Sequence, residues 1–286
     1  MMIKNLTSTS LSNITKSFNE AFSDYIMQFT ATEEYLQTRW KGAGVDFNLS
    51  FGLFMNDKIV GFIIHGIGKW NGVKTAFNVG TGVIPEHRGK RIIKKLYDYA
   101  IPVLKTHGIK QCLLEVIQEN SKAIKAYRGV GFKEERELIS FVYDLDQNYN
   151  ETDLDEPILL NTENDITKVN WDLVKTFWDF KPSWENSIPS LIRNPEIYQF
   201  IGIFKEEKLI GYAIFNPKTG NIPQFAMVKN ERRKGYGQYL FQKLTGMMKQ
   251  LVVINVDNQS LQTMDFLKAF GFKKFITQYE MEKKMT

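Results

Sequence analysis

The sequence predicts two tandem α+β domains, each an α/β mixed sandwich in which helices flank a central, mostly antiparallel sheet. Three observations lead to this prediction. The chain contains an internal repeat, each copy reads as a run of strands followed by strand–helix alternation, and an acidic, polar segment separates the copies. With 286 residues, the chain is long enough for two domains of ordinary size.

The repeat is clearest in two segments that align without gaps. "FGLFMNDKIVGFII" (51–64) matches "IGIFKEEKLIGYAI" (201–214), and each reads as a β-hairpin with a charged turn. Downstream, Arg88 matches Arg232, and the Gly-Phe pair that ends "GVGF" (129–132) matches the one that ends "KAFGF" (268–272). The offset between the copies shrinks from 150 to 144 to 140, as small differences in loop length require.

The segment between the copies, "DQNYNETDLDEP" (146–157), has the composition of an exposed linker and ends in proline. We therefore expect an N-terminal domain at 1–147, a linker at 148–156 and a C-terminal domain at 157–286.

The elements of the first copy can be read in order. A short strand at 2–6 precedes helical stretches near 10–28 and 32–41, and strands follow near 49–55, 59–67 and 75–83. The turns "NDK" and "WNG" join these strands. Next come a helix near 89–105 with one apolar face, the buried-type strand "QCLLEVI", a helix at 121–129 that Asn120 can cap, and two closing strands that end near "FVYDL". The second copy repeats this plan with a helix near 235–249, a strand at 251–255 and a helix near 258–269.

The composition is that of a globular protein with a sizeable core, since 43% of the residues are hydrophobic and 24% are charged. The net charge of +5 is compatible with an anionic ligand but is also common without one. We expect neither a membrane span nor a leader peptide, because no apolar run approaches about 18 residues. The single cysteine, Cys112, lies in an apolar run and predicts a buried thiol in a reducing, cytoplasmic setting. The three histidines are scattered, so we expect no metal site.

Two basic segments lie where an apolar strand passes into a long helix: "RGKRII" (88–93) and "RRKGYG" (232–237). The first amides of a helix have no intrahelical acceptor and lie at the positive end of its dipole, so such a junction can bind pyrophosphate. Gly235 and Gly237 keep the second loop open, whereas Arg91 and Ile93 occupy the matching positions of the first. Neither loop fits a Walker A or a Rossmann pattern, and a basic turn without a ligand is the alternative that six residues alone allow.

With these segments the chain resembles the GNAT acyltransferase superfamily, as a tandem two-domain member. "GVIPEHRGKRIIKKLYDYA" and "MVKNERRKGYGQYLFQKL" are similar to the family segment Arg/Gln-x-x-Gly-x-Gly/Ala. "NSKAIKAYRGVGF" (120–132) matches the following family segment, Asn-x-x-Ala-x-x-x-Tyr-x-x-x-Gly-Phe, at every fixed position. The resemblance covers both halves and implies an acetyl-CoA-dependent N-acetyltransferase.

The resemblance also implies roles for individual residues. The pantetheine arm of acetyl-CoA would pair with a splayed strand, here 78–83 or 223–228, and Tyr127 falls on the general-acid position. Asn120 falls on a position that often contacts the cofactor as well as capping the helix. The implied cofactor-binding residues are Val83, the backbone amides of Arg88, Gly89, Lys90, Arg91 and Ile93, the side chain of Asn120 and, in the second copy, Arg233, Lys234, Gly235 and Gly237.

The chemistry requires a proton donor for the departing thiolate and a proton acceptor for the attacking amine. A phenol with a pKa of about 10 can serve as the donor to a thiolate whose conjugate acid has a pKa of about 8.5. For the acceptor, Glu115 is the first candidate, acting directly or through water, and His65 and an ordered water are the alternatives. A structural carboxylate at Glu115 also remains open.

The two copies depart from the family pattern in complementary ways. The second has Leu267 at the tyrosine position and Ser260 at the asparagine position. Since leucine cannot donate a proton, we expect catalysis in the N-terminal domain, with the reverse assignment as the alternative. A non-enzymatic acyl-CoA sensor or scaffold is a second alternative. Because the basic residues are not interleaved with stacking aromatics, nucleic acid is a weaker partner, and we expect none, nor a membrane.

The acceptor is expected to be a small-molecule or peptide amine whose identity the sequence does not give, and the oligomeric state, a homodimer included, is left open. The walls of the acceptor site are expected to come from the early helices near 10–41 and 165–194 and from the hairpin between the last strands. The aromatic side chains of Tyr25, Phe29, Tyr35 and Trp40 could line such a pocket, although their helical spacing favours core packing. The aromatic segment 171–191 is interpreted as helices that pack on the sheet or at a domain interface, without a ligand.

Overall fold

The computed structural model describes residues 1–26, 29–144, 154 and 157–285. The linker predicted at 148–156 lies outside these residues apart from Leu154. The chain forms two compact units: an N-terminal unit of Met1–Arg136 and Tyr279–Thr286, and a C-terminal unit of Glu137–Gln278. Each predicted half therefore contributes the end of its last strand to the other unit.

The N-terminal unit contains a mixed sheet with the order β1-β2-β3-β4-β5-β12. The first four strands pair antiparallel, and β4 pairs parallel with β5, which confirms the predicted mixed, mostly antiparallel sheet. The elements are β1 (Met2–Asn5), α1 (Leu11–Ala21), α2 (Glu33–Ala43), β2 (Phe51–Met55), β3 (Lys58–Trp70), β4 (Val73–Val83), a 3-10 turn (Pro85–His87), α3 (Ile92–Thr106), β5 (Gln111–Ile117), α4 (Ser121–Gly129) and the beginning of β6 (Lys133–Asp144).

The two predicted hairpin turns are present, and their backbone geometry explains the sequence. Asn56 and Asp57 have φ of 47° and 59°, and Asn71 and Gly72 have φ of 52° and 79°. Two successive positive φ values define the tight turn that matches the twist of antiparallel strands, and Asn, Asp and Gly adopt it most readily. The prediction of two closing strands in the first copy is wrong, because residues 133–144 form the single strand β6.

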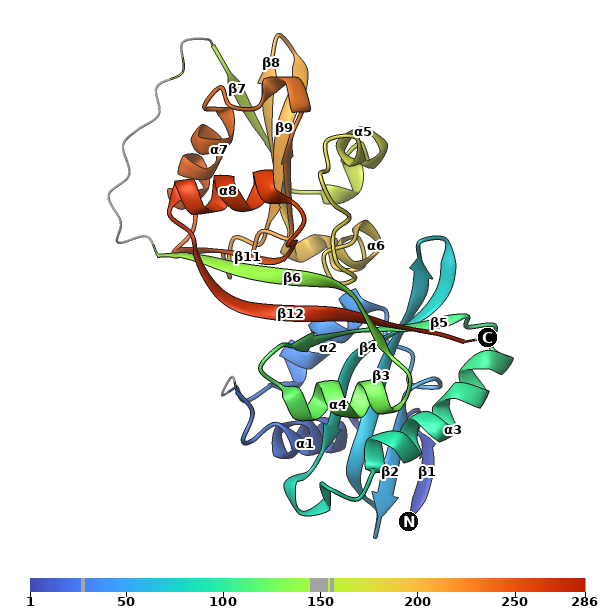
Figure 1. Ribbon diagram of the computed structural model, residues 1–286. Coiled ribbons are helices and arrows are strands. Elements are labelled where there is room, and N and C mark those ends of the chain that lie inside the picture. Colours follow the sequence, from blue (N-terminus) through green and yellow to red (C-terminus); the bar gives the residue numbers. More distant parts are fainter. Residues whose placement is uncertain (27–28, 145–153, 155–156, 286) are drawn as a thin grey trace. The chain divides into compact units, whose positions relative to one another are not determined.

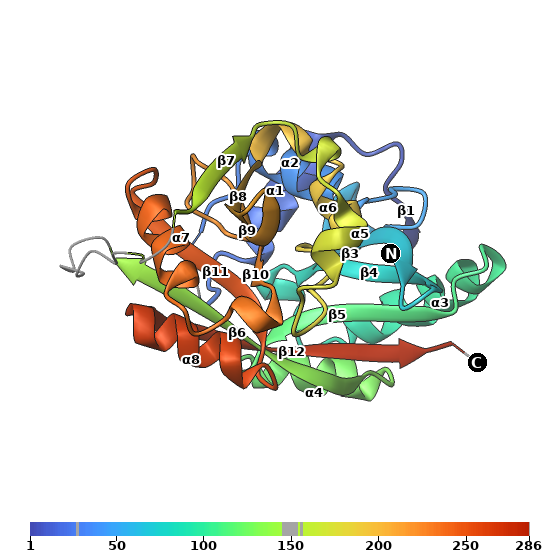
Figure 2. The ribbon, with the colours of Figure 1, turned by 90° about the horizontal axis from the view of Figure 1, so that it is seen from above.

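Helices cover both faces of the N-terminal sheet: α1 and α2 lie on one side of β3 and β4, and α3 and α4 on the other (Figures 1 and 2). The contact is close at Gly66, where an added Cβ would clash with the carbonyl oxygen of Ala43 at the end of α2. The prediction of a helix to residue 28 is too long, because α1 ends at Ala21. Trp40 is buried as expected, whereas Phe29 and Tyr35 are exposed and contact each other with ring centroids 4.8 Å apart.

The C-terminal unit has a four-stranded sheet with the order β10-β9-β8-β7, while β11 pairs antiparallel with β6. Its elements are β7 (Leu159–Glu163), a 3-10 turn (Ile166–Lys168), α5 (Trp171–Lys175), α6 (Ile188–Leu191), a 3-10 turn (Pro195–Ile197), β8 (Gln199–Lys205), β9 (Lys208–Phe215), β10 (Gln224–Met227), a 3-10 turn (Lys229–Glu231), α7 (Tyr236–Thr245), β11 (Gln250–Asp257), α8 (Leu261–Phe270) and β12 (Lys273–Lys284), whose end lies in the N-terminal unit.

Side-chain alternation along β8 and β9 divides the core of this unit into two clusters. Phe200, Tyr212 and Ile214 pack with residues of α5 and α6, whereas Ile201 and Ala213 pack with residues of α7 and α8. The helices accordingly lie on opposite sides of these strands (Figures 1 and 2). The repeat predicted from sequence corresponds to a repeated order of elements: β4, α3, β5 and α4 in the first copy, and β10, α7, β11 and α8 in the second.

Candidate active site

A β-bulge in β4 shapes the candidate site of the N-terminal unit. Ile64 of β3 pairs with Gly80, and the next residue, His65, pairs with Asn78, so Val79 is the extra residue. A bulge reverses the alternation of side chains beyond it. Asn78 and the residues that follow Gly80 are thereby brought into an arrangement that a regular strand does not allow.

The same region is where β4 and β5 separate. Their last pair is Asn78 with Leu114, although β4 continues to Val83 and β5 to Ile117. Beyond that pair, the edge of β4 that faces β5 is not used in the sheet. Backbone groups of an unpaired strand edge can bind an extended ligand arm as another strand would, which is the role that the family resemblance implied for 78–83.

Four polar side chains gather in this opening. Asn78 donates from Nδ2 to Thr81 Oγ1 at 2.6 Å and to Tyr97 Oη, on α3, at 2.9 Å. Tyr127 on α4 is the fourth, and its hydroxyl lies near Thr81 and Asn78. Burial raises the pKa of Tyr127 to about 12, against the smaller, opposite effect of these two polar side chains. The phenol of Tyr127 is therefore protonated at neutral pH.

Asn120 caps α4 as predicted: its Oδ1 accepts from the amide of Ala123 at 3.1 Å. Its side chain also lies near Tyr25, whose pKa is raised because the effect of burial outweighs the lowering effect of the Asn120 side chain. Tyr25 follows α1, so a residue from the predicted acceptor-binding segment lies at the end of the opening between the strands.

The two candidate proton acceptors differ in position. Since paired residues of parallel strands share a face, Leu114 lies on the face of Asn78, and Glu115 lies on the opposite face, which α1 and α2 cover. The side chain of Glu115 is half-buried. The candidate base and the candidate acid are therefore on opposite faces of the sheet, with the strand opening between them.

His65 is fully buried, and its Nδ1 lies 2.6 Å from the carbonyl oxygen of Leu49, to which it donates. Burial lowers its pKa to about 4, so the imidazole is neutral at physiological pH. Its ring centroid is 6.5 Å from that of Tyr97, and no hydrogen bond to Nε2 is found among the described residues. His65 thus anchors the 46–50 segment to β3.

This burial predicts a dependence of stability on pH. Between pH 6.5 and 4 the unfolded chain protonates His65 while the folded chain does not, so stability falls as the pH falls through this range. We expect the free energy of unfolding to drop by roughly 3 kcal/mol from this residue alone. Urea titrations at pH 6.5 and at pH 4 measure the change in the free energy of unfolding for the wild type and for His65→Asn. The control is His107→Asn, because His107 is exposed. Equal pH dependence in wild type and His65→Asn would contradict this account.

The first basic loop keeps its turn geometry without the usual glycines. Gly89 and Arg91 both have positive φ, 76° and 55°, and Arg91 is the residue before α3. The amide of Arg88 donates to the carbonyl oxygen of Pro85, so the amides that can face a ligand begin at Gly89. The first-turn amides of α3 lack intrahelical acceptors and complete a site for an anion.

Arg88 has a structural task that sequence reasoning did not identify. Its guanidinium donates to Asp24 through both terminal nitrogens, to the carbonyl oxygen of Ala21, and from Nε to the carbonyl oxygen of Val83. It therefore holds the end of β4 and the end of α1 against the loop. Its side chain is committed to these bonds, and so is the carbonyl of Val83.

Arg232 repeats this clamp in the C-terminal unit. It donates from Nε to the carbonyl oxygen of Met227, and through its terminal nitrogens to Asp179, Gln262 and the carbonyl oxygen of Phe177. The following loop again has two positive φ values, at Arg233 (64°) and Gly235 (83°). The glycine and the arginine have exchanged places between the two loops, while the backbone conformation is the same.

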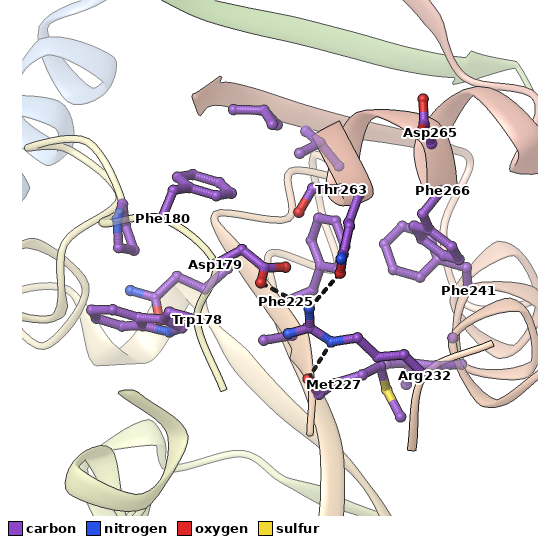
Figure 3. Close-up of a pocket in the computed structure, with 18 of the residues that line it drawn as sticks. Trp178, Asp179, Phe180, Phe225, Met227, Arg232, Phe241, Thr263, Asp265 and Phe266 are labelled. Atoms are coloured by element: carbon purple, nitrogen blue, oxygen red, sulfur yellow. Dashed lines mark hydrogen bonds and ion pairs between the residues drawn. The ribbon is translucent and has the colours of Figure 1, made fainter. Parts of the chain in front are cut away.

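A cavity of about 410 Å³ lies beside the second loop, within the C-terminal unit (Figure 3). β10 forms one edge of its sheet and meets β11 only through a bridge between Asn221 and Val252, before β10 begins. The cavity occupies the opening beyond that bridge. Its walls include three contacting rings, Phe225, Phe241 and Phe266, and the loop residues Arg233, Gly235 and Gly237.

The segment 178–186 lines one side of this cavity, a role that its aromatic composition alone does not predict. Trp178, Asp179 and Phe180 line it, and Asn186 accepts from Gln224 on β10 at 2.6 Å while donating to the carbonyl oxygen of Ile254 on β11 at 3.0 Å. Asn186 thus bridges the two diverging strands. The interpretation of 171–191 as helices that pack on the sheet or at a domain interface, without a ligand, did not include this lining of the cavity.

The two openings differ in chemistry at matching positions. α7 begins 144 positions after α3, and α8 begins 140 positions after α4; β4 and β10, which precede α3 and α7, also end 144 positions apart. Every hydroxyl or amide of the N-terminal cluster is replaced by a hydrocarbon side chain in the C-terminal unit: Asn78 by Ile222, Thr81 by Phe225, Tyr97 by Phe241 and Tyr127 by Leu267. Ser260, at the position of Asn120, makes no capping bond.

Within the described ranges, no group of three His, Cys, Asp or Glu side chains could hold a metal ion. In the same part of the chain, no helix has both the length and the apolar character to cross a bilayer. Cys112 is buried, as predicted, and burial raises the pKa of its thiol to about 12.

Comparisons with known proteins agree with this geometry. The model of the acetyltransferase (GNAT) family matches residues 12–132 and 163–272. No curated protein matches the sequence significantly. Among solved structures, a tandem GNAT protein from the clavulanic acid biosynthesis pathway is similar, with a TM-score of 0.74, 12% identity and coverage of 99% of this chain and 98% of that one. A GCN5-related N-acetyltransferase from Sphaerobacter thermophilus has a TM-score of 0.73, 13% identity and coverage of 99% and 95%.

These structural likenesses show the fold, and the sequence match in both halves shows the family. The strand opening and the basic loop before a helix are present in both units, in the order that the family model matches, whereas the bulge of β4 has no counterpart in the pairing of β10 with β9. The chain is a tandem member of the acetyltransferase (GNAT) family.

Proposed function

We propose that the N-terminal unit transfers an acetyl group from acetyl-CoA to a primary amine of a small molecule or peptide, with Tyr127 as the general acid. The observation that carries the proposal is the contrast between the two openings: the hydroxyl of Tyr127 lies among polar partners in one, and Leu267 is buried at its position in the other. The cytoplasmic setting expected from Cys112 belongs to the same proposal.

The residues of the N-terminal unit fit acetyl-CoA. The unpaired edge of β4 after Asn78 can hold an extended arm, and the amides from Gly89 to Ile93 can hold a pyrophosphate at the start of α3. The loop accepts Arg91 without losing the left-handed geometry, so the replaced glycine does not remove the anion site. Lys90 and Arg91 add positive charge beside it.

Bound acetyl-CoA supplies the thioester carbonyl that a neutral amine attacks. Glu115, directly or through water, accepts the proton that the amine loses, on the α1 and α2 face of the sheet. Tyr127 donates its proton to the sulfur as the C–S bond breaks, on the other face, and regains it from solvent after product release. The products are an amide and free CoA thiol.

The C-terminal unit offers the competing assignment, which its glycine-containing loop and cavity favour. In the proposal this unit binds the CoA moiety without turning it over, because its opening has no hydroxyl at the matching positions. A chain that binds acetyl-CoA in both units and transfers to no amine would be a sensor, the non-enzymatic alternative.

Charge reversals in the first and in the second basic loop distinguish catalysis in the N-terminal unit from catalysis in the C-terminal unit. We expect Lys90→Glu with Arg91→Glu to raise the KM for acetyl-CoA by at least tenfold, because two favourable phosphate contacts become repulsive. We expect Arg233→Glu with Lys234→Glu to remove one binding event from calorimetric titration with acetyl-CoA while kcat stays within about twofold. Activity is followed as thiol release with a panel of amino acids, polyamines, aminoglycosides and peptides. Loss of turnover in the second variant and not the first would reverse the assignment.

A further inference from the structure

We propose that the cavity of the C-terminal unit binds an acyl-CoA whose acyl chain is several carbons longer than acetyl, with the chain among the phenylalanine rings and the pyrophosphate at the second basic loop. The inference rests on the proposed function for the CoA moiety alone. The length and the apolar character of the acyl group go beyond it, since the proposed function gives the C-terminal unit no preference among acyl groups.

One end of the cavity suits an anion. Gly235 and Gly237 line this end, and Gly235 directly precedes α7, whose first-turn amides lack intrahelical acceptors. Arg233 lines the cavity as well, and no ion pair of its side chain is found in the described part of the chain. A pyrophosphate at this end therefore meets both open amides and a cation that no carboxylate neutralises.

The carboxylates of the lining do not cancel the charge of the loop. Asp179 is paired with Arg232 at 2.7 Å, and Glu231 is paired with Lys234 at 3.0 Å. The third acid of the lining, Asp265, lies on α8 and not on the loop (Figure 3). The loop end of the cavity therefore keeps a net positive charge.

Apolar side chains leave part of their surface open to the cavity. Phe225 and Met227 on β10 and Phe266 on α8 pack against the core but are only partly buried, and all three line the cavity. The ring of Phe241 on α7 contacts both other rings, with centroids 4.9 Å from that of Phe225 and 5.1 Å from that of Phe266 (Figure 3). Removal of this apolar surface from water favours the binding of a hydrocarbon chain.

Two buried polar side chains of the lining, Gln224 and Asn186, are bonded to their neighbours. Gln224 donates to the carbonyl oxygen of Asn186 at 2.6 Å and accepts from the hydroxyl of Tyr212 at 3.2 Å. The amide of Asn186 donates to the carbonyl oxygen of Ile254 at 3.0 Å. A polar acyl group would have to compete with these bonds, whereas a hydrocarbon chain needs no hydrogen-bond partner.

The contrast with the N-terminal unit gives the preference its direction. Phe225 lies at the position that matches Thr81, and Phe266 at the position that matches Ala126, so two of the three rings replace smaller side chains. The C-terminal opening therefore offers more apolar surface at these positions than the N-terminal opening does. A longer acyl chain gains from this surface, and an acetyl group is too short to cover it.

The test is calorimetric titration of the variant that carries Lys90→Glu and Arg91→Glu, in which the first basic loop is repulsive to phosphate and the C-terminal unit supplies the heat. The ligands are CoA, acetyl-CoA and hexanoyl-CoA, whose acyl chain has four more methylenes than acetyl. Full burial of a methylene lowers Kd about threefold to fourfold. We expect a Kd for hexanoyl-CoA at least tenfold below that for acetyl-CoA, and a more negative heat-capacity change of binding.

Two further variants in the same background locate the acyl chain. Phe225→Thr introduces the residue type of the matching N-terminal position, and we expect it to reduce the preference for hexanoyl-CoA over acetyl-CoA to less than about threefold. Its Kd for CoA should stay within about threefold, which shows that the loop and the unit remain folded. Phe275→Thr is the matched control and should keep the preference, because Phe275 is an exposed phenylalanine of the same unit outside the cavity lining.

The outcomes distinguish this inference from the proposed function. Equal Kd values for the three ligands, or no binding in the Lys90→Glu and Arg91→Glu background, would overturn the inference and leave transfer by the N-terminal unit untouched. A preference for hexanoyl-CoA that the wild type shows and this background lacks would place the acyl site in the N-terminal unit and overturn the inference too. Full activity in Tyr127→Phe would instead overturn the proposed function without altering the preference for chain length.

Discussion

Tyr127→Phe is expected to lower kcat at least tenfold while the affinity for acetyl-CoA changes by no more than a few fold. The substitution removes one oxygen from a buried ring and leaves its packing on Phe132, where the ring centroids are 5.9 Å apart. Under the proposed function, the substitution removes proton donation to the leaving sulfur and leaves acetyl-CoA binding in place. The measurement is steady-state thiol release together with calorimetric titration of acetyl-CoA.

The pH profile gives the same assignment an independent check. Tyr127 acts as an acid only while protonated, and its pKa of about 12 keeps it protonated throughout the range from pH 7 to 10. Proton donation is therefore not lost in this range, and kcat should show no alkaline decline. A decline with a midpoint below pH 10 would indicate a different acid, as would full activity of Tyr127→Phe. Tyr239→Phe, beside the second loop but not at the acid position, is the matched control.

The residues that could be predicted from sequence are those whose signal is local. The hairpin turns follow from Asn, Asp and Gly in a charged turn, and the cap at Asn120 follows from its place before a helical pattern. Tyr127 followed from a motif with several fixed positions. The repeat could be predicted because its two copies share the spacing of hydrophobic residues and differ only slightly in loop length.

What could not be predicted depends on pairing between distant strands. Asn78 and Thr81 are three apart in an apparently regular strand, and only the register with β3 reveals the bulge that joins them. The clamp of Arg88 on Asp24 joins residues 64 positions apart. The last residues of β12 belong to the N-terminal unit. The sequence of the strand does not predict this, because its hydrophobic pattern is compatible with pairing in either unit.

One ion pair makes that placement testable. Arg136, at the start of β6, donates from Nε and a terminal nitrogen to the two carboxylate oxygens of Glu280 on β12, each at 2.9 Å, across 144 residues of sequence. The side chains are 12% and 4% exposed, and the guanidinium lies 5.7 Å from the ring centroid of Trp70. Removing one partner of a buried pair leaves an uncompensated charge.

We therefore expect Glu280→Gln to lower the free energy of unfolding of the N-terminal unit by about 3 kcal/mol. Glu134→Gln is the control: it breaks the ion pair of Glu134 with Arg128, whose side chain is 59% exposed, and should cost less than about 1 kcal/mol. Urea denaturation followed by hydrogen exchange of the β5 and β12 amides assigns the loss to the N-terminal unit, which matters because two units need not unfold together.

The double variant Arg136→Met with Glu280→Leu sharpens this test. Replacing both charges by apolar side chains removes the desolvation cost as well as the attraction, so it should be less destabilising than Glu280→Gln alone. If Glu280→Gln were as mild as Glu134→Gln, or if its effect appeared in the exchange of β8 and β9, the end of β12 would not be held in the N-terminal unit by this pair. A large loss of stability in Glu280→Gln, confined to the N-terminal unit, would show that the end of β12 stabilises the same unit that contains Tyr127.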